Sequence, residues 1–155
     1  MNYTFTAEER KEIIALMNRE IIPAIGCTEP MVVSLCVAKA CETLGSAPQR
    51  ISVALSANIF KNAMGVGIPN SGMTGLPIAV ALGVVVGRSE YGLEVLRDVT
   101  KEDVERAKTL LHEVEPSIFV TDESDDILFI KVVVEAGNDS AEVIISGTHT
   151  NFSAI

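Results

Sequence analysis

The amino-acid sequence predicts an α+β fold, in which a small, mainly antiparallel sheet of about four strands packs against apolar helices. Helical patterns come first along the chain, and a run of strand-like segments follows them. Such separate runs of helices and strands are typical of this class. The chain has 155 residues, 48% of them hydrophobic, which suits a single domain, 1–155, with a buried core.

Two helices, separated by a short turn, are predicted in the N-terminal part. Thr6 and Glu9 form the capping-box pattern that starts a helix, and Pro23 ends it. Pro30 suits the first turn of a second helix, and Gly45 marks its end. The second helix is apolar all round, so we expect it to be buried. The first helix carries an apolar stripe formed by Ile13, Ile14, Leu16, Met17 and Ile21.

Two further helices are predicted in the middle of the chain. Residues 76–87 form an apolar helix with Pro77 near its start, and Thr100 caps an amphipathic helix over residues 101–113. Residues 58–75, which precede them, are rich in glycine and polar residues and show no strong period. This segment is therefore expected to be a loop.

Four segments have the pattern of strands. Residues 50–57 alternate and are partly β-branched, which predicts the first strand. The others are predicted at residues 117–121, 127–136 and 141–148. Gly137, Asn138 and Asp139 lie between the last two, which should form an antiparallel hairpin.

The composition argues against nucleic-acid and membrane partners. The chain has 21 acidic and 12 basic residues, a net charge of -9, whereas phosphate surfaces are bound by clustered Lys and Arg. Its start, Met1 to Arg10, is polar and charged, unlike a signal peptide. The apolar run at residues 76–87 is too short to span a bilayer. We therefore expect a cytoplasmic protein, whose three cysteines do not form a disulfide framework.

Cys27 is the first candidate for chemistry. It precedes a helix N-terminus, where backbone N–H groups and the helix dipole favour a thiolate, the form that binds a metal or cluster. The alternative is a small residue in a tight turn. Cys36 and Cys41 lie further along the helix and point in different directions at about 100° per residue. The three sulfurs should therefore not converge, and Cys36 and Cys41 are expected to be core residues.

A glycine-rich loop is the second candidate. Gly67, Gly72 and Thr74 imitate a phosphate-binding loop, but Met73 stands where that motif requires Lys. The pattern therefore argues against nucleotide binding. Exposed N–H groups in such a loop can hold a carboxylate, and a purely structural turn is the alternative.

Polar side chains before the loop and near the end of the chain complete the candidates. Lys61 could pair with a substrate carboxylate, with Asn58 and Asn62 orienting it. His149 could act as a general base, whereas His112 lies among acidic residues on a predicted surface. A solvated Lys61 and a His149 that only caps a strand are the alternatives.

Four segments together resemble the cysteine desulfidase family, which is related to the α chain of bacterial iron–sulfur serine dehydratases. They are Ile22 to Pro30, with the sequence IPAIGCTEP, Asn58 to Gly72, Leu76 to Ala79, and Gly147 to Asn151. The resemblance implies a [4Fe–4S]-dependent lyase of amino-acid catabolism that removes the β-substituent of an amino acid. Cysteine would give pyruvate, ammonia and sulfide, and serine would give pyruvate and ammonia.

The resemblance also implies that this chain is the N-terminal portion of a larger enzyme. Cys27 matches one of the cluster's cysteine ligands, and the others would lie in a C-terminal region beyond this chain. The chain alone should then hold no intact cluster and be inactive. Lys61 and His149 are the implied catalytic residues, and Thr28 and Glu29 would support the ligand turn. The implied substrate-binding residues are Asn58, Asn62, Gly67, Asn70, Ser71, Gly72, Thr74, Thr150 and Asn151.

Two other functions fit the same sequence: a non-catalytic module that binds or senses a small amino acid, and a structural half that completes a separate catalytic chain. Iron content would discriminate a cluster enzyme from a binding module. The mean hydropathy of +0.34 is high for a lone domain. We therefore expect an apolar surface that a C-terminal partner or a second copy covers.

Overall fold

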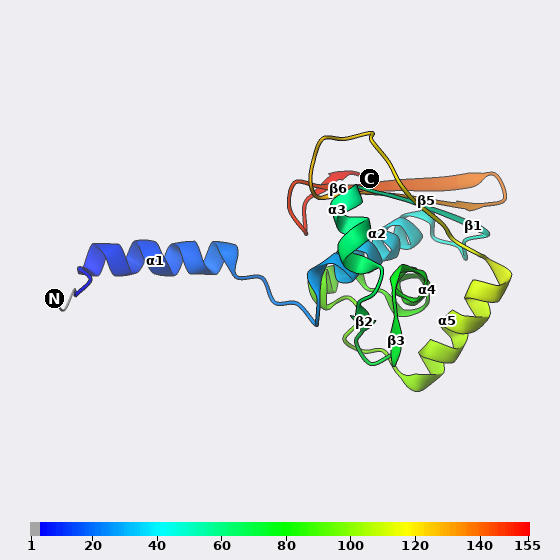
Figure 1. Ribbon diagram of the computed structural model, residues 1–155, viewed down its shortest axis with the longest axis horizontal. Helices are drawn as coiled ribbons and strands as arrows, with labels where there is room; N and C mark the ends of the chain where they lie inside the picture. The colour runs from blue at the N-terminus through cyan, green and yellow to red at the C-terminus, as the bar shows by residue number, and fades with distance from the viewer. Residues whose placement is uncertain (1–3) are drawn as a thin grey trace.

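The computed structural model describes residues 4–155 and shows a mixed sheet with helices against one face (Figure 1). The first three residues of the stretch compared with a signal peptide lie outside the described part. The sheet has five strands in the order β4-β1-β5-β6-β7, and only the β4–β1 pair is parallel. The strands are β1 (Arg50–Leu55), β4 (Ser117–Val120), β5 (Phe129–Ala136), β6 (Asp139–Ser146) and β7 (Phe152–Ala154). The predicted α+β class is confirmed, with β7 added to the four expected strands.

The core lies between the sheet and two apolar helices, α2 (Thr28–Leu44) and α4 (Leu76–Val86). α2 packs on β5 and β6, and α4 lies between α2 and α5 (Lys101–Glu113). Gly83 permits a close approach of α4 to α2, because a Cβ there would lie 2.9 Å from the carbonyl oxygen of Ser34. The Ser34 hydroxyl, though buried, donates to the carbonyl of Ala79 at 2.8 Å. The prediction that the second helix is buried is confirmed.

The segment expected to be a loop, residues 58–75, is more regular than predicted. It contains most of the short helix α3 (Ala57–Ala63) and a ribbon of two short strands, β2 (Gly67–Ile68) and β3 (Met73–Thr74). Ser56 caps α3 and also donates its hydroxyl hydrogen to the carbonyl of Ile127, at 2.6 Å. A helix this short has too few turns to show a hydrophobic period, which explains the wrong expectation. A 3-10 helix, η1 (Ser89–Glu94), was likewise not predicted.

The first helix, α1 (Ala7–Glu20), forms as predicted but does not pack. Its capping box is present: the Glu9 carboxylate accepts from the Thr6 backbone N–H at 2.8 Å, and Thr6 Oγ1 accepts from Glu9 N at 3.2 Å. None of its residues is buried, and Figure 1 shows it projecting away from the sheet and the other helices. Within residues 4–155, no helix is long and apolar enough to cross a membrane.

Candidate functional site

The turn that carries Cys27 packs closely against the β2–β3 ribbon. Gly26 adopts a positive φ of 84°, and a Cβ there would lie 2.9 Å from Cγ of Pro69 at the tip of the β2–β3 ribbon. Cys27 follows as the N-cap of α2, with its side chain exposed and making no capping hydrogen bond. The turn therefore requires glycine at position 26 and presents the thiol to solvent.

Glu29, in the first turn of α2, joins the predicted residues around Cys27. Its Oε2 atom accepts a hydrogen bond from the Cys27 thiol at 3.0 Å and another from the Thr28 hydroxyl at 3.2 Å. Its Oε1 atom accepts from the Asn62 side-chain amide of α3 at 3.3 Å. One carboxylate thus connects the start of α2 with α3.

This arrangement corrects the expected state of Cys27. The helix N-terminus favours a thiolate, but the thiol donates its hydrogen to Glu29, and this hydrogen bond raises the pKa of Cys27 above its usual value. The same bond is the main cause that lowers the pKa of the Glu29 carboxyl. A carboxylate in contact outweighs the helix dipole, because it carries a full charge against a partial one. In the free protein Cys27 is therefore a protonated thiol at neutral pH.

A cleft of about 550 Å³ opens beside Glu29. Asn58 of α3 and His149, from the turn between β6 and β7, line it together with Glu29, and both are half-buried. Two acidic residues that sequence reasoning missed, Asp125 and Asp126, complete its rim. Three carboxyl groups on one cleft favour a positively charged group of a ligand.

Other predicted residues lie outside this cleft. Lys61 is on the exposed side of α3. Ser71 belongs to the β2–β3 ribbon, where its hydroxyl donates to the carbonyl of Ile68 at 2.7 Å. Asn151 closes the turn before β7 by donating to the carbonyl of Ser146 at 3.0 Å. Five other residues predicted to bind substrate also lie outside the cleft lining: Gly67, Asn70, Gly72, Thr74 and Thr150.

The ribbon approaches the site through Pro69 rather than through its backbone donors. Several of its N–H groups are already used: Ser71 N donates to Ile68 O at 3.2 Å, Met73 N to Ser71 Oγ at 3.0 Å and Gly75 N to Val66 O at 2.9 Å. The loop that was expected to bind a carboxylate is thus a hairpin, and several of its N–H groups already donate to hydrogen bonds within it. Its binding of a ligand stays a prediction.

The three cysteines point to different parts of the molecule, as predicted from helix geometry. Cys36 is fully buried against the sheet, with its sulfur 3.3 Å from the carbonyl oxygen of Val143. Cys41 lies near the opposite end of α2 from Cys27. Within residues 4–155, no three His, Cys, Asp or Glu side chains are grouped closely enough to hold a metal ion. Cys27 alone does not fit a [4Fe–4S] cluster, which is held by several cysteine thiolates.

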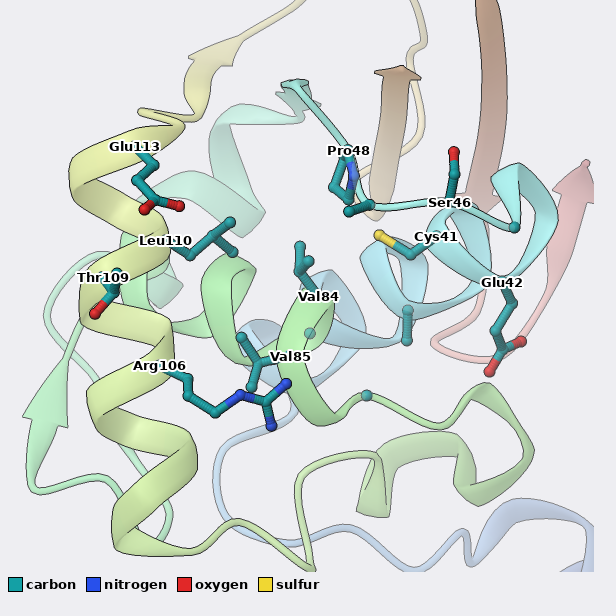
Figure 2. Close-up of a pocket in the computed structure, with 15 residues that line it drawn as sticks. Cys41, Glu42, Ser46, Pro48, Val84, Val85, Arg106, Thr109, Leu110 and Glu113 are labelled. Atoms are coloured by element: carbon teal, nitrogen blue, oxygen red, sulfur yellow. The ribbon is translucent and has the colours of Figure 1, made fainter. Parts of the chain in front are cut away.

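A larger cavity lies away from these residues, at the C-terminal end of α2 (Figure 2). It measures about 710 Å³ and is lined by α2, α4 and α5, including Cys41, Val84 and Leu110. None of the predicted site residues lines it. The cleft beside Glu29 is the candidate site, because several polar side chains converge on it.

The residues missed by sequence reasoning share one property. Asp125 and Asp126 lie in an acidic stretch that reads as an ordinary surface turn, and Gly26 reads as one turn residue among many. The relevance of Asp125 and Asp126 depends on the sheet order: β1 inserts between β4 and β5 and brings the turn before β5 to the start of α3. That of Gly26 depends on its contact with Pro69 of the β2–β3 ribbon. No local pattern in the sequence carries that information.

Comparison with known proteins identifies similar chains of greater length. The chain is 60% identical over 147 residues to a UPF0597 protein of Bacteroides fragilis, covering 95% of this chain and 34% of that protein. It is 57% identical over 144 residues to one of Phocaeicola vulgatus, covering 93% and 33%. It is 46% identical over 140 residues to one of Aeromonas hydrophila, covering 90% and 31%. No family model matches the chain, and no solved structure matches it.

These relatives correct the family assignment made from sequence motifs. The similar proteins carry the name UPF0597, and nothing links them to cysteine desulfidases or serine dehydratases. The short motifs around Cys27 and the glycine-rich loop were therefore not sufficient to assign that family. The chain spans about a third of the length of the curated relatives that it matches.

Proposed function

We propose that this chain forms one wall of the active site of a larger cytoplasmic lyase that eliminates the β-substituent of a small amino acid, cysteine or serine. The observation that carries the proposal is the position of Glu29. Its carboxylate is bonded to Cys27 and Asn62 and lies on the same cleft as Asn58 and His149. Protein outside these 155 residues would complete the site, since the similar relatives are about three times as long.

The charge of the cleft supports an amino acid as ligand. Glu29, Asp125 and Asp126 together favour an ammonium group. The side-chain amide of Asn58 offers hydrogen-bond donors for the carboxylate of the same ligand. The chain's contribution to binding would therefore be to orient the amino acid through its two charged ends.

The elimination requires a base and a leaving group. His149 lines the cleft and would remove the α-proton, while the bond from the β-carbon to sulfur or oxygen breaks and the leaving atom takes the electron pair. The resulting aminoacrylate tautomerises to an imine, which water hydrolyses to pyruvate and ammonia. Lys61 is exposed on α3 and does not line the cleft. It would contact the ligand only if protein outside these 155 residues extended the site over α3.

Cys27 is proposed as this chain's ligand to a [4Fe–4S] cluster of the complete enzyme. Replacing the thiol proton by a metal would turn the sulfur from a donor to Glu29 into an anion. Glu29 and Thr28 would then position the turn rather than hold the proton. One cysteine is too few for a cluster, so the other ligands would come from protein outside these 155 residues.

A second candidate is a binding module for a small amino acid without catalysis. The protonated state of Cys27 favours it, because a thiol bonded to a carboxylate is a poor nucleophile and a poor ligand until something removes the proton. The two candidates share the cleft but differ in iron content and in turnover.

The test combines this chain with the remaining region of the Bacteroides fragilis relative. After anaerobic reconstitution, we expect iron and sulfide in the mixture but well under one cluster per chain in this chain alone. The mixture should release pyruvate from cysteine or serine, and Cys27→Ser should abolish that release. Cys41→Ser, on the same helix, is the matched control and should leave turnover in place.

Full activity of the Cys27→Ser mixture would remove Cys27 from the site and overturn the cluster assignment. Binding of serine or cysteine to this chain by calorimetry, with neither iron nor pyruvate in the mixture, would favour the binding module. A mixture that shows no binding and no turnover would overturn both candidates.

A further inference from the structure

Helix α1 carries an apolar stripe that the rest of its own chain does not cover. Ile14 is 57% exposed, and Leu16 and Met17 are each 49% exposed. Seven residues, 21–27, connect the helix to α2, and Figure 1 shows it on the opposite side of the molecule from α5. An amphipathic helix with its apolar face in water is suited to lie in a hydrophobic groove.

The large cavity between α2, α4 and α5 is such a groove (Figure 2). Val84 and Val85 of α4 and Leu110 of α5 line it with aliphatic side chains. Arg106 and Glu113, one on each side of Leu110 along α5, put opposite charges at its rim. The cavity is about 710 Å³, and its α5 wall is two helical turns long, as is the stripe of α1 that could fill it.

The charges of α1 and α5 are complementary at matching positions. α1 has Glu12, Leu16 and Arg19, and α5 has Arg106, Leu110 and Glu113. The spacing is the same in both helices, four residues and then three, and the two charges are reversed. Side by side and parallel, the helices would place Glu12 against Arg106 and Arg19 against Glu113, with the leucines between them.

The present partners of these charges do not prevent the exchange. Arg19 pairs with the adjacent Glu20 at 2.7 Å, and Arg106 pairs with Asp103 at 3.1 Å, with both arginine side chains more than half exposed. Exposed pairs of this kind contribute little, about 0–1 kcal/mol. Both arginines can therefore turn to a new carboxylate, or share one, at small cost.

We propose that α1 of one copy lies in the cavity of a second copy, parallel to α5, in a reciprocal dimer. The cavity is at the C-terminal end of α2, whereas α1 leaves the body at the N-terminal end of that helix, about 21 Å away along its axis. A neighbouring molecule can reach the groove without changing the connection at residues 21–27. Reciprocal exchange also forms the interface twice, which brings a short helix closer to the 1,200 Å² or so that stable interfaces bury.

The test uses two charge-reversed variants of this chain, each with exposed substitutions that leave the core unchanged. The first carries Glu12→Arg and Arg19→Glu on α1, and the second carries Arg106→Glu and Glu113→Arg on α5. Sedimentation should show a dimer for the natural chain and a dimer dissociation constant raised about tenfold or more for each variant. Lys11→Glu, off the apolar stripe of α1, is the control and should not change dimerisation.

Mixing the two variants decides between a second copy and the chain's own body. Each α1 then meets an α5 of opposite charge only on the other partner, so the mixture should recover the affinity of the natural dimer. If the natural chain stays monomeric at a concentration of about 100 µM, its dimer dissociation constant is weaker than micromolar, and the proposal is overturned. A mixture that recovers nothing also overturns it, and would place α1 on its own body or elsewhere.

Discussion

The two ends and the middle of α2 place the same residue type in three different environments. Cys27 at the N-terminus is exposed, and the pKa of its thiol is raised by a hydrogen bond to Glu29. Cys36 in the middle is buried, and burial raises its pKa further. Cys41 near the C-terminus is partly buried, which raises its pKa to about 11. The position of a cysteine on a helix therefore does not determine its reactivity. Burial of the thiol and contact with a carboxylate set its pKa instead.

The largest expected contrast is in the rate of thiol modification. With a disulfide reagent at pH 8, Cys27 should react first, Cys41 next, and Cys36 only when the protein unfolds. Because the buried thiol needs global opening, its rate should be lower than that of Cys27 by about a thousandfold or more. Mass spectrometry of the modified peptides over time measures the order. Equal rates for Cys27 and Cys36 would contradict the burial of Cys36.

The middle of α2 should also respond more strongly to substitution than its end. Cys36→Ser places a hydroxyl in an apolar site and should lower the free energy of unfolding by about 1–3 kcal/mol. Cys27→Ser changes an exposed atom, so we expect a change within about 0.5 kcal/mol. Urea denaturation followed by circular dichroism compares the two. A Cys27→Ser loss as large as that of Cys36→Ser would show that the Cys27 turn is structural.

A smaller effect concerns the hydrogen bond between Cys27 and Glu29. Glu29→Gln removes the negative charge that opposes ionisation of the thiol, so the pKa of Cys27 should fall. The rate of Cys27 alkylation plotted against pH should then shift to lower pH, without a change in the rate at high pH. Asp126→Asn, on the same cleft, is the control. A shift to higher pH would contradict the assigned bond.

The smallest effect is on stability in acid. The pKa of Glu29 is lower in the folded than in the unfolded chain, so its contribution is present above the unfolded pKa and lost as pH falls through the folded one. Glu29→Gln should therefore reduce the difference in stability between neutral and acidic pH, with the change confined to pH values near and below 4.5, the ordinary value for Glu. Urea midpoints measured from pH 7 to pH 3 test this. A Glu29→Gln chain with an unchanged pH dependence would count against the pKa assignment.

Much of the candidate site could be named from the sequence, but its assembly could not. Cys27 stood out as the residue before a helix start and Asn62 as a polar residue before the glycine-rich loop, whereas Glu29 was named only through the family resemblance. The structure joins the three through one carboxylate. His149, more than a hundred residues from Glu29, reaches the same cleft through the pairing of β6 with β5. Short motifs were also weak evidence for a family, because turns and helix starts use the same few residues in unrelated chains.

The sequence by itself determined the helices α1, α2, α4 and α5 and most strands of the sheet, since caps, glycine stops and hydrophobic periods are local signals. Only the tertiary structure decided that α1 stays uncovered while α2 is buried, although both carry apolar residues. It also decided that Cys27 keeps its proton, because the nearby carboxylate opposes the thiolate that a helix start alone would favour. Periodicity describes one segment, whereas burial and pKa depend on what the rest of the chain brings against it.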